Sequence, residues 1–157
     1  MASEAPHRPR KRFGQNFLHD KFVIEQIVEA FNPDPDLAIV EIGPGKGALT
    51  IPLLHKFGTI NVVEIDTDLA QLLDDNCRTT GDLRLHVADA LKFDYSQIQP
   101  APLQIIGNLP YNIGTKIIEN FTDTFHSDHI TSGIFMLQKE VGEKILSKKG
   151  TKLYNGY

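Results

Sequence analysis

The stretch that decides the fold lies at residues 37–50 and reads LAIVEIGPGKGALT. Its apolar run at residues 37–42 predicts a buried strand, and a helical pattern follows at residues 48–57, which Gly58 ends. Three closely spaced glycines lie between them. Glycines at a strand-to-helix turn let the backbone bend tightly and approach a ligand closely, beside the amide groups of a helix N-terminus. The stretch therefore predicts a strand, a ligand loop and a helix of an α/β domain.

Strand and helix patterns alternate along the rest of the chain. Apolar runs predict four further strands, at residues 60–65, 83–87, 103–106 and 130–137. Helical spacing predicts four further helices, at residues 22–31, 69–77, 115–125 and 139–147. Strands rich in Ile and Val that alternate with helices indicate a Rossmann-like α/β fold, with a mostly parallel sheet covered on both faces. Ligands in such folds bind beyond the carboxyl ends of the strands.

Length and composition suit one globular domain of 157 residues, of which 41% are hydrophobic. The single cysteine, Cys77, cannot form an internal disulfide, which favours a reducing compartment. No apolar run reaches the roughly 20 residues of a membrane helix, and no apolar signal core follows the basic N-terminus. We therefore expect a soluble, cytoplasmic, monomeric protein.

The formal net charge of -4 is unevenly distributed. Residues 1–12 carry four basic residues against Glu4, and residues 139–152 carry five Lys against two Glu, so each end has a net charge of +3. The intervening residues 13–138 therefore have a net charge of -10. Positive charge at both ends favours contact with a phosphate backbone, although a solvated tail explains residues 1–12 equally well. We expect a basic tail at residues 1–12 and one domain at residues 13–157.

The glycine loop at residues 41–47 has the spacing G-x-G-x-G. A dinucleotide fingerprint has G-x-G-x-x-G, and a phosphate-binding P-loop has G-x-x-x-x-G-K-[ST], so the loop fits neither. The form E/D-x-G-x-G-x-G is typical of S-adenosylmethionine-dependent methyltransferases, which hold an amino acid moiety rather than a pyrophosphate. A generic structural turn is the alternative explanation of this glycine cluster.

Carboxylates lie at the ends of the second and third predicted strands. Glu64, 17 residues after Gly47, can accept both ribose hydroxyls of a bound adenosine. A helix cap is the alternative role, and it fits Asp66 better than Glu64, because Glu is a poor cap. Asp89 can accept the exocyclic amine of the cofactor's adenine, although an Asp after a strand is more often a loop or cap residue.

The fourth predicted strand runs into Asn108-Leu109-Pro110-Tyr111. An aromatic amine is a poor nucleophile because its lone pair is delocalised into the ring, so an enzyme that methylates it needs acceptors for the N–H groups. The Asn108 side-chain oxygen and a backbone carbonyl beside Pro110 can accept them, and Tyr111 offers a face on which the base stacks. Positioning then supplies most of the catalysis, without a general base. A plain strand-to-helix turn is the alternative.

Together these motifs resemble the KsgA/RsmA family of ribosomal RNA adenine dimethyltransferases along nearly the whole chain. The matching segments are GQNFL at 14–18, EIGPGKGALT at 41–50, EID at 64–66, DA at 89–90, NLPYNI at 108–113 and MLQKEV at 136–141. The resemblance implies a class I S-adenosylmethionine-dependent methyltransferase fold and a catalytic site at Asn108, Leu109, Pro110 and Tyr111. The cofactor contacts that it implies are Asn16, Leu18, Gly43, Glu64, Asp89 and Asn108, with Gly45, Ile65 and Ala90 beside them in the same loops.

The resemblance also implies a reaction. Two methyl groups pass from S-adenosylmethionine to N6 of each of two adjacent adenines near the 3′ end of 16S (small-subunit) rRNA, within a ribosomal assembly intermediate and without a metal. A looped-out adenine, which costs less to unstack than one in a duplex, suits a stacking pocket. One alternative is a large-subunit rRNA methyltransferase of the macrolide-resistance type, which shares the glycine loop and the N-[LI]-P-Y site. Another is a non-catalytic RNA-binding assembly factor on the same fold. The glycine spacing disfavours a third, a nicotinamide-dependent Rossmann enzyme.

Family members are usually longer. They close the sheet with a final antiparallel hairpin and add a small helical domain that binds RNA, whereas here residues 150–157 resemble only the lead-in to that hairpin. We therefore expect a methyltransferase domain truncated at its C-terminal end. The implied cofactor and catalytic contacts lie between Asn16 and Tyr111, so we expect cofactor binding to survive the truncation.

Overall fold

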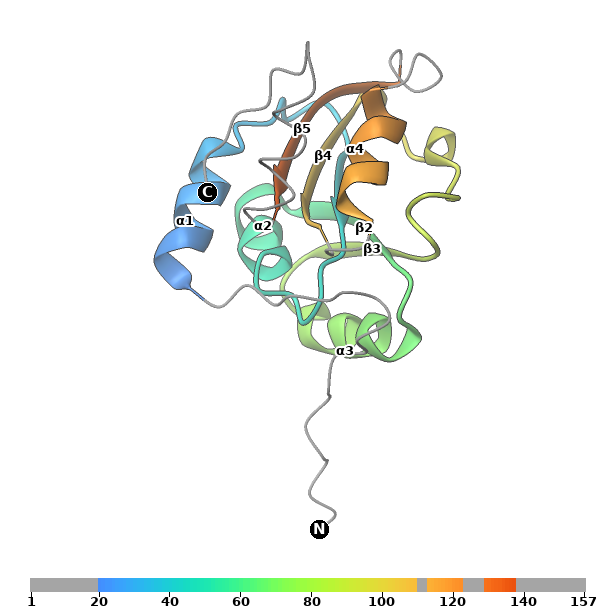
Figure 1. The fold of residues 1–157 in the computed structure, drawn as a ribbon. Coiled ribbons are helices and arrows are strands. Elements are labelled where there is room, and N and C mark those ends of the chain that lie inside the picture. Colours follow the sequence, from blue (N-terminus) through green and yellow to red (C-terminus); the bar gives the residue numbers. More distant parts are fainter. Residues whose placement is uncertain (1–19, 110–112, 123–128, 138–157) are drawn as a thin grey trace.

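Five parallel strands form the centre of the fold (Figure 1). The computed structural model describes residues 20–109, 113–122 and 129–137. The strand order is β3-β2-β1-β4-β5, and every neighbouring pair is parallel, which confirms the predicted Rossmann-like α/β fold. The elements are α1 (Lys21–Ala30), β1 (Ile39–Ile42), α2 (Thr50–Phe57), β2 (Thr59–Glu64), α3 (Thr67–Cys77), β3 (Asp82–Val87), β4 (Leu103–Asn108), α4 (Gly114–Thr122) and β5 (Ile130–Met136).

Each face of the sheet has its own core, because alternate residues of a strand point to opposite faces. On one face, Ile39 and Val62 pack with buried residues of α1, α2 and α3. On the other face, Val40 and Ile105 pack with α4 and with the segment after β3. The covering of both faces explains why the strand sequences are nearly continuous apolar runs. None of the described helices has both the length and the apolar character needed to cross a membrane.

Two helix starts, those of α2 and α3, differ from the predicted ones by two residues, whereas those of α1 and α4 differ by one. α2 begins at Thr50 rather than at residue 48, because the chain is still in a turn in which the Gly47 N–H donates to Pro44 O at 3.0 Å. α3 begins at Thr67 rather than at residue 69, because Asp66 Oδ1 caps it by accepting the N–H of Asp68 at 2.9 Å. The expectation that Asp66 is a helix cap is therefore confirmed.

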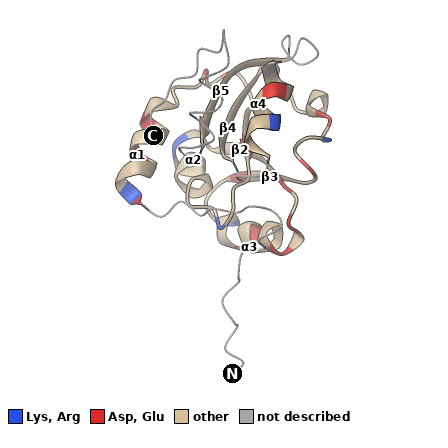
Figure 2. Cartoon of the chain, viewed as in Figure 1, with Lys and Arg blue, Asp and Glu red and all other residues tan. Residues whose placement is uncertain are grey.

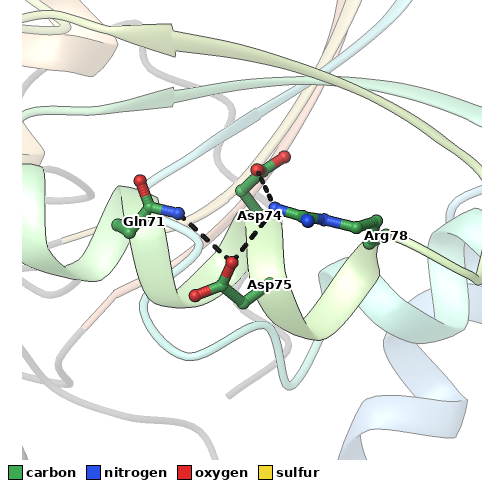
Figure 3. A network of polar contacts seen from close by, with 4 residues as sticks. All are labelled: Gln71, Asp74, Asp75 and Arg78. Atoms are coloured by element: carbon green, nitrogen blue, oxygen red, sulfur yellow. Dashed lines mark hydrogen bonds and ion pairs between the residues drawn. The ribbon is translucent and has the colours of Figure 1, made fainter.

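An exposed polar network lies on the C-terminal half of α3 (Figure 3). Arg78 Nη2 is 3.4 Å from Asp74 Oδ2 and 3.2 Å from Asp75 Oδ1, which also accepts a hydrogen bond from the Gln71 amide. These side chains are well exposed, so each ion pair contributes only a few tenths of a kcal/mol, or about 0.3–0.5. Burial of Leu73 and its apolar neighbours on the opposite side of α3 holds the helix to the sheet.

The pairing of β4 with β5 contains an irregularity at its start. Leu103 lies opposite Ile130, but Gln104 lies opposite Ser132, so Thr131 is an extra residue in β5. Because of this extra residue, Ile130 faces the core on the α4 side. If the residues of β5 alternated regularly from Ser132 back to Ile130, Ile130 would face the opposite side of the sheet.

One element was not predicted, and some predictions concern residues that the structure does not describe. A short 3₁₀ helix, Tyr95–Gln97, follows β3 and was not predicted. Some predictions fall outside the described residues: the cofactor contacts Asn16 and Leu18, the catalytic residues Pro110 and Tyr111, residues 123–125 of the fourth helix, the helix at 139–147, the hairpin lead-in at 150–157 and the basic ends at 1–12 and 139–152.

Candidate active site

The sheet brings the ends of its strands to one edge. Ile42 at the end of β1 lies opposite Val63 in β2 and Gly107 in β4. Glu64, the last residue of β2, lies opposite Val87, the last residue of β3. The loops after β1, β2, β3 and β4 therefore start side by side, as the parallel fold predicts.

The glycine loop after β1 needs backbone conformations that other residues rarely adopt. Gly43 and Gly45 have φ angles of 66° and 56°, in the left-handed region. The Gly43 N–H donates to Val63 O at 3.2 Å, which ties the loop to the end of β2. On the other side, a Cβ at Gly107 would lie 2.9 Å from Ile42 O, so only glycine lets β4 approach β1 this closely.

Glu64 presents a buried carboxylate beside the glycine loop. Its side chain is buried, and Oε2 accepts the Asp66 N–H at 3.1 Å. Burial raises the pKa of Glu64, whereas hydrogen bonds from the backbone N–H groups of Asp66, Ile65 and Gly45 lower it in part. Glu64 thus links its own loop to the glycine loop. Ile65 is 42% exposed at the same edge, an accessible apolar side chain.

Glu41 is a second buried carboxyl group, and no role was predicted for it from the sequence. It lies in β1 and is 1% exposed, and Thr50 Oγ1 donates to its Oε1 at 2.5 Å. Burial raises the pKa of Glu41 to about 8, the Thr50 hydrogen bond opposes that rise, and the charge of Glu64 adds to it. Glu41 is therefore mostly protonated at neutral pH. The signal in the sequence was an ionisable residue inside an apolar strand.

The loop after β3 holds Asp89 in a tight turn. Asp89 Oδ1 accepts the Leu91 N–H at 2.9 Å, and its backbone carbonyl accepts the Phe93 N–H at 2.9 Å. The alternative prediction, that Asp89 is a turn residue, is therefore confirmed. The Leu91 N–H takes only one of the about four acceptor positions of the Asp89 carboxylate, so the turn role leaves acceptor positions for a ligand. Ala90 packs into the core, and its carbonyl accepts a hydrogen bond from the Tyr95 hydroxyl at 2.7 Å.

Asn108 is the last residue of β4 rather than part of the loop beyond it. It lies opposite Met136, and the next N–H, of Leu109, donates to Met136 O at 3.0 Å. Asn108 is partly exposed, whereas the Leu109 side chain is only 2% exposed and belongs to the core on the α4 side. By strand alternation Asn108 faces the same side of the sheet as Ile106, the side on which Glu64 also lies.

The described residues are strongly acidic. They contain seven Lys and Arg against fifteen Asp and Glu, a formal net charge of -8. Figure 2 shows acidic positions on α3 and in the loops, with basic positions scattered over several elements. A surface of this charge does not by itself attract a phosphate backbone. The concentrated positive charge of the chain lies in residues 1–12 and 139–152.

Solved structures of RNA methyltransferases share this fold. The 23S rRNA methyltransferase ErmE matches with a TM-score of 0.70 and 29% identity, over 82% of this chain and 50% of that one. A dimethyladenosine transferase from Plasmodium falciparum matches with a TM-score of 0.69 and 24% identity, over 87% of this chain and 48% of that one. The second likeness supports the fold alone.

The sequence matches a family model and curated relatives. The model described as ribosomal RNA adenine dimethylase matches residues 6–156. Ribosomal RNA small subunit methyltransferase A of Nitrosococcus oceani is 46% identical over 94% of this chain and 56% of its own length. The protein of the same name from Tolumonas auensis is 48% identical over 94% of this chain and 55% of its own length. The chain thus spans about half the length of the curated relatives it matches. It belongs to the ribosomal RNA adenine dimethylase family.

Proposed function

We propose that this chain binds S-adenosylmethionine at the carboxyl edge of its sheet, and that the protein dimethylates N6 of two adjacent adenines near the 3′ end of small-subunit rRNA. One observation supports this most. The strand order β3-β2-β1-β4 sets Asp89, Glu64, the glycine loop and Asn108 in a row. Three of the proposed partners (adenine, ribose and amino acid moiety) follow one another in the same order along the cofactor, and Asn108, on the other side of the glycine loop, would hold the target amine.

The residues present fit this cofactor. The Glu64 carboxylate can accept two ribose hydroxyls with its two oxygens, and charge-assisted hydrogen bonds of this kind are strong. Asp89 would accept the adenine amine, flanked by Ile65 and Ala90. Gly43 and Gly45 let the backbone approach the amino acid moiety closely. When bound, the cofactor supplies an electrophilic methyl group.

Asn108 would act on the target base. Its side-chain oxygen accepts an N–H of the adenine amine, together with a backbone carbonyl beside Pro110, and these bonds turn the nitrogen lone pair out of conjugation. Tyr111 would stack on the base, and buried Leu109 anchors the segment. No residue needs to remove a proton first, because the amine loses it after it has become cationic. Asn16 and Leu18 would complete the cofactor site.

The substrate is proposed from the family and from the charge distribution. Curated relatives of 46% and 48% identity are named small-subunit methyltransferases. The basic segments at 1–12 and 139–152 would contact RNA phosphates, which the acidic described surface does not attract. We place the reaction in a ribosomal assembly intermediate, where the adenines are accessible.

The test is methylation of undermethylated small-subunit particles with isotopically labelled S-adenosylmethionine, read by mass spectrometry of the rRNA nucleosides. We expect dimethyladenosine from the wild type and from the control Asn76→Ala, which changes an exposed asparagine of α3. Asn108→Ala should lower turnover by about 10²–10³-fold, the usual effect of removing one positioned hydrogen-bonding group, while it still binds S-adenosylhomocysteine. Normal turnover by Asn108→Ala would contradict its role.

The same assay separates the alternatives. Large-subunit rRNA, offered in parallel, would be the methylated substrate if the protein resembled ErmE in activity as well as in structure. Binding to particles without any methylation would instead indicate an assembly factor. Either result would overturn the proposed reaction.

A further inference from the structure

A hydrogen-bond chain leads from the core of the protein to the carboxylate of Asp89. The Tyr95 hydroxyl donates to the Ala90 carbonyl at 2.7 Å, and the Leu91 N–H donates to Asp89 Oδ1 at 2.9 Å. The Ala90 carbonyl and the Leu91 N–H belong to one peptide group, which is planar. The hydroxyl and the carboxylate therefore form hydrogen bonds to opposite sides of the same planar peptide group.

Tyr95 is itself firmly held. Its side chain is 1% exposed, and its ring makes edge contacts with Phe93 and Phe121, at centroid distances of 5.0 and 5.1 Å. Its backbone carbonyl lies 2.9 Å from His129 Nε2, just before β5. The hydroxyl is thus a fixed donor, because its residue is held by contacts to α4 and to the residue just before β5.

The hydroxyl also stays protonated. Burial raises the pKa of Tyr95 well above its usual value, and the charge of Asp89 adds to the rise. A group that cannot ionise donates its hydrogen bond at every pH at which the protein is folded. Hydrogen bonds in such chains polarise one another, so the first bond strengthens the second.

We propose that Tyr95 is a positioning residue for cofactor recognition: through the Ala90–Leu91 peptide, its hydroxyl fixes the Asp89 carboxylate in the orientation that accepts the adenine amine. The inference rests on the proposed cofactor site. It adds a residue outside the predicted site, which reaches the ligand only through the peptide and the carboxylate.

The test is Tyr95→Phe, which keeps the ring and its packing and removes only the hydroxyl. Binding is measured by calorimetry with S-adenosylhomocysteine and with its analogue that carries hydrogen in place of the adenine amine. For S-adenosylhomocysteine we expect Kd to rise about three- to tenfold, the effect of one net hydrogen bond. For the analogue we expect no difference between wild type and variant. In the background of Asp89→Ala, Tyr95→Phe should have no further effect.

Ser96→Ala is the matched control. It removes a hydroxyl that donates to Asp94 Oδ1 in the same 3₁₀ helix, without a path to Asp89, and should leave both Kd values unchanged. If the wild type binds and Tyr95→Phe binds equally well, the positioning role is wrong while the proposed cofactor site stands. An equal rise in Kd for both ligands would mean that Tyr95→Phe disturbs the whole cofactor site, and it would also overturn the positioning role. Failure of the wild type to bind S-adenosylhomocysteine would overturn the proposed function itself.

Discussion

Replacing Glu41 by glutamine should change how the stability of the protein depends on pH. The folded state holds a proton on Glu41 up to about pH 8, whereas the ordinary value for an unfolded chain is 4.5. The stabilisation from this proton is fully present below pH 4.5 and is lost as the pH rises to about 8. Between these values the unfolded state binds fewer protons, so the free energy of unfolding falls by about 1.4 kcal/mol per pH unit.

Glu41→Gln removes this slope and keeps the rest of the site. The amide oxygen still accepts the Thr50 hydroxyl, and the residue cannot ionise. From pH 5.5 to 7.5 the stability of the variant relative to the wild type should therefore rise by about 2.5 kcal/mol, because the slope flattens near each pKa. Any constant cost of placing an amide in the core cancels in this difference.

Urea unfolding at pH 5.5, 6.5 and 7.5, followed by far-ultraviolet circular dichroism, measures the effect directly. The chain has no Trp, so circular dichroism is a better probe than indole fluorescence. Glu25→Gln, an exposed position on α1, is the control and should show no such trend. The reasoning is refuted if the stability difference between Glu41→Gln and wild type is flat over this range, or if it falls with pH.

Three further predictions concern binding and stability. Glu64→Gln should weaken S-adenosylhomocysteine binding in calorimetry by about tenfold or more, because a charge-assisted acceptor is lost; an unchanged Kd would exclude the ribose role. Asp66→Ala should lower the free energy of unfolding by about 1 kcal/mol through loss of the α3 cap, whereas Asp68→Ala, in the first turn, should cost less. Removing residues 1–12 should reduce the slope of log K against log salt for RNA binding by about 2–3, since four cations are lost, and should leave cofactor binding intact. An unchanged slope would place the RNA contacts elsewhere.

The sequence was sufficient to predict the helix cap that follows β2. A glutamate after a strand is a poor helix cap and an aspartate is a good one, so residue type alone separates the role of Asp66 from that of Glu64. The fold class followed from the alternation of apolar runs and helical spacing. Both predictions depend on local patterns, which a single sequence contains.

The sequence was not sufficient where contacts depend on the arrangement of elements. The Tyr95 hydroxyl reaches Ala90 only because a short 3₁₀ helix folds back under the loop, and three residues are too few to show a period. Glu41 meets Thr50 across a loop whose path depends on positive φ angles. The row of proposed ligand groups likewise requires the order of the strands, which alternation alone does not specify.

The extra residue, Thr131, makes the start of β5 a position at which insertions and deletions can be tolerated during evolution. On the far side of the irregularity the pairing is regular, and it ends with Asn108 opposite Met136. A relative that lacked one residue here could have regular pairing at Leu103 without shifting that last pair, and the residue opposite Leu103 would still face the core on the α4 side. Insertions and deletions before this point are thus separated from the proposed catalytic end of the sheet, which can stay in register while the preceding loop varies.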